Sequence, residues 1–302
     1  MQFLHTYSRR QIGWGVVGVL CVVSLALWTA AIAVTPRGVL TFAVMDVGQG
    51  DSLYVESPTG VQVVIDGGPD SSLLRELPKR MPYGDRTIDA VIATHPDADH
   101  VAGFVDLLRR YRVGAFIDPG ISKPTATAQR LEQEVADLHI PRYLARRGMV
   151  LDLGGGARLE ILFPDRDVSG LASNKVNEGG IVARLVYGES EALLMADVPV
   201  SVEDHLVVLD GGQLQSDLLK VGHHGSKTAT SDEFLSAVHP QIAIISVGAN
   251  NRYGHPTAEV LNRLREYGIT VVRTDLNGAV TFRSDGKNFY QTASPLASDF
   301  FK

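Results

Sequence analysis

The sequence has a single cysteine, Cys21, among its 302 residues. One cysteine excludes an intrachain disulfide and a zinc site built from thiolates. Any metal ion must therefore be held by histidine, aspartate or glutamate. Positive charge is also scarce, because 28 lysines and arginines stand against 34 aspartates and glutamates, giving a formal net charge of -6. This balance argues against a protein that binds nucleic acid through a broad basic surface.

Hydrophobic residues make up 45% of the chain and charged residues 21%. This composition excludes a disordered or fibrous protein, because most of the chain can bury a core. The sequence contains no internal repeat and no low-complexity tract. Its length allows one large domain or two ordinary ones.

One long segment, residues 12–34, carries no charge. A helix over this segment would be about 34 Å long, enough to cross a bilayer core of about 30 Å. Trp14 and Trp28 lie towards its two ends, where aromatic side chains meet the membrane surface. Arg9 and Arg10 precede it, and positive charge favours the cytoplasmic side. The segment predicts a transmembrane helix with its N-terminus in the cytoplasm.

A cleaved signal peptide is the alternative interpretation of this segment. Residues 31–33 read Ala-Ile-Ala, which fits a small-residue cleavage site. The apolar run is nevertheless longer than the usual 7–15 residues of a signal peptide. We therefore expect a single-pass protein of the cell membrane, with the rest of the chain outside the cytoplasm. A secreted protein remains the alternative.

Short β-rich runs alternate with helical stretches along the rest of the chain. This pattern predicts one mixed α/β domain over residues 39–291, preceded by a short segment, 1–11, and the apolar helix, and followed by a loose tail, 292–302. The expected strands lie at residues 39–45, 52–56, 61–66, 88–94, 157–163, 181–187, 192–196, 218–221, 242–247, 270–273 and 279–283. The expected helices lie at residues 101–110, 128–138, 231–238 and 257–267.

The segment richest in potential ligands is His-Pro-Asp-Ala-Asp-His, between a predicted strand and a predicted helix. It places His95, Asp97, Asp99 and His100 within six residues. Such a cluster at the end of a buried strand would repel itself without a cation, and imidazole with carboxylate suits zinc or manganese. A polar loop with Asp99 as a helix cap is the alternative. A calcium loop is disfavoured, because the glycine and terminal glutamate of an EF-hand are missing.

Three later segments also place polar side chains after predicted strands. Asp197 follows one strand, His223 and His224 follow another, and His255 lies between a third strand and a helix. Each is an ordinary turn or structural residue when taken alone. Together they predict that successive strands deliver ligands to a common rim.

This series of motifs resembles the metallo-β-lactamase superfamily and, more closely, the hydrolase domain of ComEC-type competence (DNA-uptake) proteins. The matching segments are residues 46–52, 65–68, 95–100, 196–197, 219–226, 251–256 and 274–278. The resemblance implies an αββα sandwich with two divalent metal ions, zinc or manganese, on one edge.

The resemblance also implies a role for each matching residue. One metal would be held by His95, Asp97 and His223, the other by Asp99, His100 and His255, and Asp197 would bridge them. The implied catalytic residues are Asp99, Asp197 and His224, and the candidate substrate contacts are Lys220, Lys227, Asn251 and Tyr253. Whether His223 or His224 is the ligand stays open.

Three positions set this chain apart from most of the superfamily. Asp97 stands where most members have histidine, as in the ComEC-type branch, and its harder oxygen ligand favours manganese over zinc. Ala196 replaces the usual glycine before the bridging aspartate. The asparagine-rich run at residues 174–180 lacks the serine that usually follows it.

These features predict a membrane-anchored two-metal hydrolase, most plainly a phosphodiesterase or nuclease linked to DNA uptake. The expected partners are a phosphodiester substrate, with DNA as a candidate, the lipid bilayer around residues 12–34, and a separate channel protein, since one span cannot form a channel. The alternatives are a phosphorylcholine-type esterase or small-ester or lactam hydrolase, and a DNA-uptake accessory protein with a structural metal. The basic clusters that bear on DNA binding are Arg109, Arg110 and Arg112, and Arg142, Arg146 and Arg147.

Overall fold

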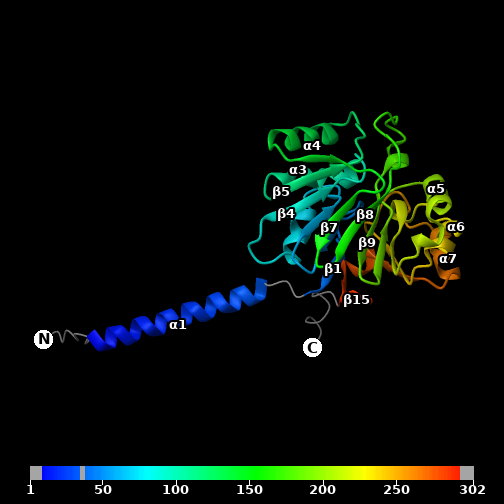
Figure 1. Cartoon of the computed structure of the whole chain (residues 1–302). Helices are drawn as coiled ribbons and strands as arrows, with labels where there is room; N and C mark the ends of the chain where they lie inside the picture. The colour runs from blue at the N-terminus through cyan, green and yellow to red at the C-terminus, as the bar shows by residue number, and fades with distance from the viewer. Residues whose placement is uncertain (1–8, 35–37, 293–302) are drawn as a thin grey trace. The chain divides into compact units, whose positions relative to one another are not determined.

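The computed structural model describes residues 9–34 and 38–292. It divides the chain into two units, Met1–Arg37 and Gly38–Lys302. In the first unit, helix α1 (Arg9–Val34) covers the predicted apolar segment (Figure 1). Among the described residues, no helix has the length and apolarity needed to cross a membrane. The helix is thus confirmed, whereas the membrane span stays a prediction. The predicted tail lies outside the described residues, except for Thr292.

Two mixed β-sheets form the centre of the second unit. The first is eight-stranded, in the order β15-β14-β1-β2-β3-β4-β5-β6, and the second is seven-stranded, in the order β13-β12-β11-β10-β9-β8-β7. The strands of the first sheet are β1 (Leu40–Val44), β2 (Leu53–Glu56), β3 (Gln62–Ile65), β4 (Thr87–Ile92), β5 (Arg112–Asp118), β6 (Arg142–Leu144), β14 (Val280–Ser284) and β15 (Phe289–Thr292). Those of the second are β7 (Val150–Gly154), β8 (Ala157–Phe163), β9 (Val182–Tyr187), β10 (Ser190–Leu194), β11 (Leu218–Lys220), β12 (Ile242–Ile245) and β13 (Thr270–Arg273).

Helices cover the outer face of each sheet. The α-helices are α2 (Leu73–Glu76), α3 (Ala98–Leu108), α4 (Ala126–Asp137), α5 (Val200–Asp210), α6 (Asp232–Val238), α7 (Ala258–Glu266) and α8 (Thr274–Asn277). Four short 3-10 turns are η1 (Leu77–Lys79), η2 (Val176–Gly179), η3 (Gly211–Leu214) and η4 (Gly222–Gly225). Helices α3 and α4 lie on the side of β4 and β5, and α5, α6 and α7 lie beyond β8 and β9 (Figure 1).

Three apolar layers hold these elements together. Strand β3 contributes to two of these layers, because its side chains alternate between the two faces of the sheet. Val63 and Ile65 enter the layer between the sheets, whereas Val64 enters the layer beneath α3. A third layer joins the second sheet to α5, α6 and α7. This arrangement is the predicted αββα sandwich.

Parallel pairing brings the functional loops to one edge of each sheet. Strands β3, β4 and β5 are parallel neighbours in the first sheet, and β10, β11 and β12 are parallel neighbours in the second. The carboxyl ends of parallel strands face the same way, so the loops that follow them share one rim. The residues predicted as ligands lie in these loops or just beyond them.

Candidate metal centre

The segment that follows β4 contains two fully buried histidines, His95 in the loop and His100 in helix α3. Helix α3 begins at Ala98, so Asp99 and His100 lie in its first turn and Asp97 occupies the capping position. The Asp97 carboxylate makes no capping hydrogen bond, and Asp99 lies inside the helix. These carboxylates therefore do not serve the alternative role of helix caps.

A buried carboxylate behind His100 sets the orientation of its ring. Asp66, at the end of β3, accepts hydrogen bonds from the Thr94 backbone N at 2.8 Å and the Thr94 hydroxyl at 2.7 Å. His100 Nδ1 lies 2.7 Å from the same carboxylate. Because Asp66 can only accept, we infer that Nδ1 carries a proton. The opposite nitrogen, Nε2, is buried without a hydrogen-bond partner.

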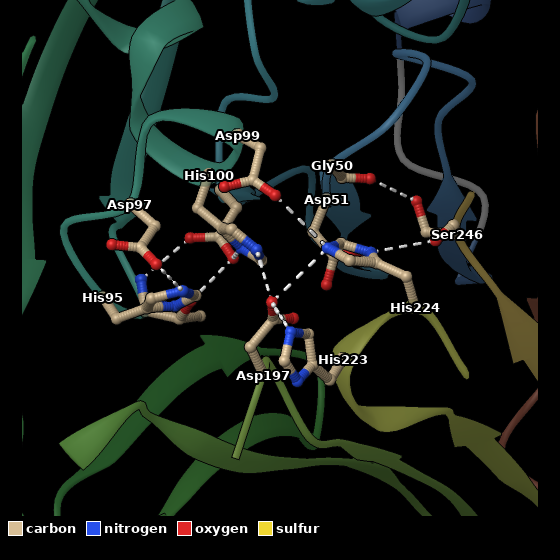
Figure 2. A network of polar contacts seen from close by, with 12 residues as sticks. Gly50, Asp51, His95, Asp97, Asp99, His100, Asp197, His223, His224 and Ser246 are labelled. Carbon is tan, nitrogen blue, oxygen red and sulfur yellow. Dashed lines mark hydrogen bonds and ion pairs between the residues drawn. The ribbon is translucent and has the colours of Figure 1, made fainter. Parts of the chain in front are cut away.

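Asp197 lies between the histidines that follow strands of the first sheet and those that follow strands of the second sheet (Figure 2). Its Oδ2 is 3.3 Å from His100 Nε2, 3.4 Å from His224 Nε2 and 3.7 Å from His223 Nε2. Its Oδ1 is buried and has no hydrogen-bond partner. One carboxylate oxygen thus faces three imidazole nitrogens, as a bridging ligand would.

The backbone of η4 turns both of its histidines towards the centre. His223 and His224 have φ values of 49° and 55°, in the left-handed region that costs non-glycine residues energy. His224 is buried, and its Nδ1 lies 3.0 Å from the Ser246 carbonyl oxygen. Its Nε2 lies 3.5 Å from Asp99 Oδ2. We infer that Nδ1 donates to the carbonyl and that the Nε2 lone pair faces the carboxylates.

The arrangement fits a divalent cation. The potential ligand atoms of Asp99, His100, Asp197 and His224 all lie within 4.8 Å of one another. Buried atoms without a hydrogen-bond partner cost about 1–3 kcal/mol each. Such atoms cluster here, namely Nε2 of His95, His100 and His224, Oδ1 of Asp197 and Nδ1 of His255. Imidazole and carboxylate are ligands for zinc and manganese, so the donor chemistry matches as well.

The other predicted ligands surround this group of four. His95 Nε2 lies 3.8 Å from Asp97 Oδ2, and the other oxygen of Asp97 pairs with Lys123. The His255 ring centre is 5.7 Å from that of His223 and 6.5 Å from that of His224. The structure thus brings all seven predicted ligands into one region, with His224 rather than His223 inside the tightest group.

Opposite charges dominate the electrostatics of the centre. Burial raises the pKa of the Asp197 carboxyl, but His224 and His100 more than offset this, and its pKa lies well below the usual range. Burial lowers the pKa of His100 and His224, but Asp197 and the carboxylates behind each ring raise both values well above normal. Burial and the neighbouring His100 lower the pKa of His95. A divalent cation bound here would displace protons from His100 and His224.

The predicted substrate contacts have different environments. Lys220 is buried, with its Nζ 2.6 Å from Asp51 Oδ2, so it cannot reach a substrate. Asn251 donates to the Gly248 and His255 carbonyls and accepts from two backbone N–H groups, so its side chain holds the loop. Tyr253 and Lys227 are exposed. The Tyr253 ring is stacked on His255, with centres 6.0 Å apart and planes 26° apart.

The structure also identifies residues to which the sequence assigned no role. They are Asp66 behind His100, Asp51 and Ser246 behind His224, and Lys123 beside Asp97. Asp51 and Asp66 belong to the matching motifs. Asp66 directly follows a strand, as the predicted ligands do, so this position could have marked it as part of the site. Lys123 lies in the loop between β5 and α4, and no sequence motif marks it.

The two basic clusters are largely neutralised by carboxylates. The ion pairs are Arg109 with Glu134, Arg142 with Asp118, Arg146 with Asp167, and Arg147 with Asp210. Arg110 and Arg112 are exposed. These clusters therefore do not form a broad unpaired basic surface.

Comparisons with known proteins agree with the fold and the motifs. The family model described as "Metallo-beta-lactamase superfamily" matches residues 45–249. The chain is 31% identical to ComE operon protein 3 of Bacillus subtilis over 79% of this chain and 32% of that protein. It is 32% identical to competence protein ComA of Neisseria gonorrhoeae over 82% of this chain and 33% of that protein. The chain thus spans about a third of the length of these relatives.

Solved structures show the same fold at low sequence identity. Igni18, a metallo hydrolase from Ignicoccus hospitalis, matches with a TM-score of 0.50 and 14% identity, over 80% of this chain and 98% of that chain. CmlA, a diiron β-hydroxylase from Streptomyces venezuelae, matches with a TM-score of 0.50 and 14% identity, over 84% of this chain and 54% of that chain. One fold accommodates both chemistries, so the reaction must be argued from the site.

Proposed function

Because the chain belongs to the metallo-β-lactamase superfamily, we propose that it is a metal-dependent hydrolase that cleaves phosphodiester bonds. The observation that carries the proposal is the group of Asp99, His100, Asp197 and His224, whose potential ligand atoms all lie within 4.8 Å of one another. Buried atoms of His100, Asp197 and His224 in this group have no hydrogen-bond partner. Similarity to competence proteins supports nucleic acid as the source of the diester.

We assign the residues of the centre to two ions that would share Asp197. Asp99, His100 and His224 would hold one ion with Asp197. The remaining predicted or neighbouring ligands, which would hold a second ion with Asp197, are His95, Asp97, His223 and His255. When bound, divalent zinc or manganese supplies Lewis acidity that activates water and neutralises charge on a phosphodiester.

The side chains around the ligands define what else the site offers a substrate. Lys123 and Lys227 bring positive charge, and Lys123 already lies against Asp97. Tyr253 presents an exposed ring whose orientation is set by His255 and by the Asn251-bound loop. An exposed aromatic ring beside a phosphodiester site suits the stacking of a nucleobase.

The membrane assignment belongs to the same proposal. Residues 12–34 would anchor the chain in the cell membrane, with the hydrolase domain outside the cytoplasm. A separate channel protein would complete a DNA-uptake system. The long uncharged segment and the competence relatives support these statements.

A second candidate is a hydrolase of small diesters or esters, such as a phosphorylcholine-type esterase. The paired arginines favour it, because a site without a broad basic surface suits a small substrate better than a long polyanion. Both candidates use the same metal centre and differ in the substrate that reaches it.

The test is hydrolysis by the full chain in detergent, loaded with Mn²⁺ or Zn²⁺. Single-stranded DNA and a bis-aryl phosphodiester serve as substrates for the wild type, Asp99→Asn and His100→Ala. His205→Ala is the matched control, because His205 pairs with Asp165 at 2.6 Å outside the centre. We expect at least a hundredfold loss in the two site variants only. Equal rates for wild type and site variants contradict the proposal, and metal binding without turnover favours a structural metal.

A further inference from the structure

A buried lysine lies directly beneath the metal centre. Lys220 ends β11, and 1% of its side chain is exposed. Among the residues that the structure describes, no other lysine is buried. Its Nζ lies 2.6 Å from Asp51 Oδ2 and 2.9 Å from the Val221 carbonyl oxygen. Burying these two charges costs desolvation energy, which apolar residues of similar volume would avoid. The pair is therefore not explained by packing alone.

The second oxygen of Asp51 leads to the centre. Asp51 Oδ1 lies 3.3 Å from His224 Nδ1, and the opposite nitrogen of His224 faces Asp99 and Asp197. Lys220, Asp51 and His224 therefore form a continuous series of contacts that ends among the ligands. In this series, Asp51 comes from the loop between β1 and β2 of the first sheet, and Lys220 comes from the second sheet.

The position of Asp51 is tightly determined. Its backbone N donates to the Asp99 carbonyl at 3.3 Å. A Cβ atom on the preceding Gly50 would lie 2.2 Å from that carbonyl oxygen, so the loop has no room for a side chain there. The Ser246 hydroxyl donates to the Gly50 carbonyl at 2.7 Å. Ser246 also offers its own carbonyl to His224 Nδ1 (Figure 2).

These contacts determine which nitrogen of His224 faces the centre. Nδ1 meets two groups that can only accept, the Ser246 carbonyl and the Asp51 carboxylate. A proton on Nδ1 can be donated to the Ser246 carbonyl oxygen and is attracted by the Asp51 carboxylate, and it leaves the Nε2 lone pair for a cation. A carboxylate behind a ligating histidine fixes its tautomer and raises its basicity. Asp51 must be negatively charged to hold the proton on His224 Nδ1, and the positive charge of Lys220 stabilises that carboxylate.

We propose that Lys220 and Asp51 are positioning residues that hold His224 as a metal ligand through Nε2. The affinity of the centre for its cation then depends on this buried pair. The inference rests on the proposed function only in taking the cluster as a metal centre, and it does not depend on the substrate. It replaces the substrate-contact role predicted for Lys220.

The simplest competing account is that the pair only joins the two sheets. The double variant Asp51→Asn/Lys220→Met separates the two accounts, because it removes both charges and leaves neither one buried alone. Zn²⁺ affinity is measured by competition with a chromophoric chelator, without substrate, and stability is measured by urea unfolding. We expect the double variant to be nearer in stability to wild type than Lys220→Met is. We also expect it to bind Zn²⁺ about 10–100-fold more weakly than wild type.

Two further measurements make the result decisive. Long-range ¹⁵N NMR of the imidazoles should show His224 as the Nδ1–H tautomer in the Zn²⁺-bound wild type and a weakened preference in the variant. The matched control is Glu160→Gln/Arg184→Met, which removes another ion pair of the second sheet, 2.7 Å long. We expect its Zn²⁺ affinity to equal that of wild type.

A double variant that binds Zn²⁺ as tightly as wild type would overturn the inference. If the double variant does not fold, Asp51→Asn alone is measured, and wild-type affinity in that folded protein has the same consequence. Weakened Zn²⁺ binding in the variant, with no phosphodiester hydrolysis by wild type, would support this inference and contradict the proposed function. The two failures are therefore distinguishable.

Discussion

Replacing Asp66 with asparagine is the sharpest single test of how the centre is oriented. Asp66 Oδ1 accepts from the Thr94 backbone N, and Oδ2 lies against the Thr94 hydroxyl and His100 Nδ1. In Asp66→Asn the amide oxygen can keep the backbone bond. The amide nitrogen then faces His100 Nδ1 and can only donate to it. His100 must place its proton on Nε2, where a metal needs a lone pair.

The size of the effect follows from the bond that is lost. A hydrogen bond to a charged group contributes about 1.5–3 kcal/mol. Asp66→Asn keeps the hydrogen bond from the Thr94 backbone N. We therefore expect the free energy of unfolding to fall by about 1.5–3 kcal/mol, the contribution of one hydrogen bond to a charged group. The same energy difference corresponds to a roughly 10–100-fold change in an equilibrium constant. We therefore expect Zn²⁺ or Mn²⁺ affinity to fall roughly 10–100-fold.

Metal affinity by chelator competition and stability by urea unfolding are measured on the same preparations. Asp118→Asn is the control, because Asp118 is also buried and hydrogen-bonded, to Gly120 N and Arg142, without contacting a predicted ligand. We expect it to lose stability while keeping its metal affinity. If Asp66→Asn binds metal as tightly as wild type, the proposed orientation of His100 is wrong.

Four further outcomes test other parts of the structure. Gly103→Ala should destabilise α3 and weaken metal binding, because the added Cβ would lie 2.0 Å from the Gly67 carbonyl oxygen. Gly212 has open space around it, so Gly212→Ala should change neither the melting temperature nor the metal affinity. Chelation of a cation held at a hundred times its Kd should remove about 2.7 kcal/mol of stability, and a melting temperature unaffected by chelator would argue against a metal centre. Tyr253→Ala should raise KM for single-stranded DNA several-fold through lost stacking without changing KM for a bis-aryl diester, and equal effects on both substrates would exclude stacking. Arg147→Ala should leave DNA affinity in a salt titration unchanged, because this arginine is paired; a large loss would show that this basic cluster contributes to DNA binding.

The meeting of the candidate ligands at one rim was predictable because it depends on one feature, strands that end in polar residues. Strand β4 has a buried core-facing pattern and leads directly into His95 and Asp97. Strand β10 likewise leads to Asp197. Parallel strands bring their carboxyl ends to one edge whatever the length of the chain between them. Sequence order and apolar patterning were therefore enough to predict a common rim, whereas the sandwich and the ligand roles were implied by the resemblance to the superfamily.

Several elements were missed, among them strands β5, β7 and β15, and two further ones have weak apolar patterning. Helix α5 (Val200–Asp210) was not predicted, because its apolar residues do not keep to one face and Val208 is 84% exposed. Strand β6 (Arg142–Leu144) is exposed at every position, so no alternation marked it. Both elements are specified by their neighbours in the fold rather than by their own periodicity.

The choice between His223 and His224 also lay beyond sequence patterns. Side chains alternate along a regular strand, but the left-handed backbone of η4 breaks that alternation at both residues. Lys220 poses a related problem. A lysine at the end of a strand suggests a side chain that reaches solvent. The reason for its burial is its contact with Asp51, which belongs to the loop between β1 and β2 of the first sheet.

The two histidines inside the tightest group have a shared design that involves both sheets. A carboxylate lies behind each ring, Asp66 behind His100 and Asp51 behind His224, and both carboxylates come from the first half of the domain. His100 also belongs to that half, whereas His224 belongs to the other. A cation between the rings would therefore bind side chains that only the folded sandwich brings together. Because the unfolded chain has no such site, the binding free energy of the cation adds to the stability of the assembled sandwich.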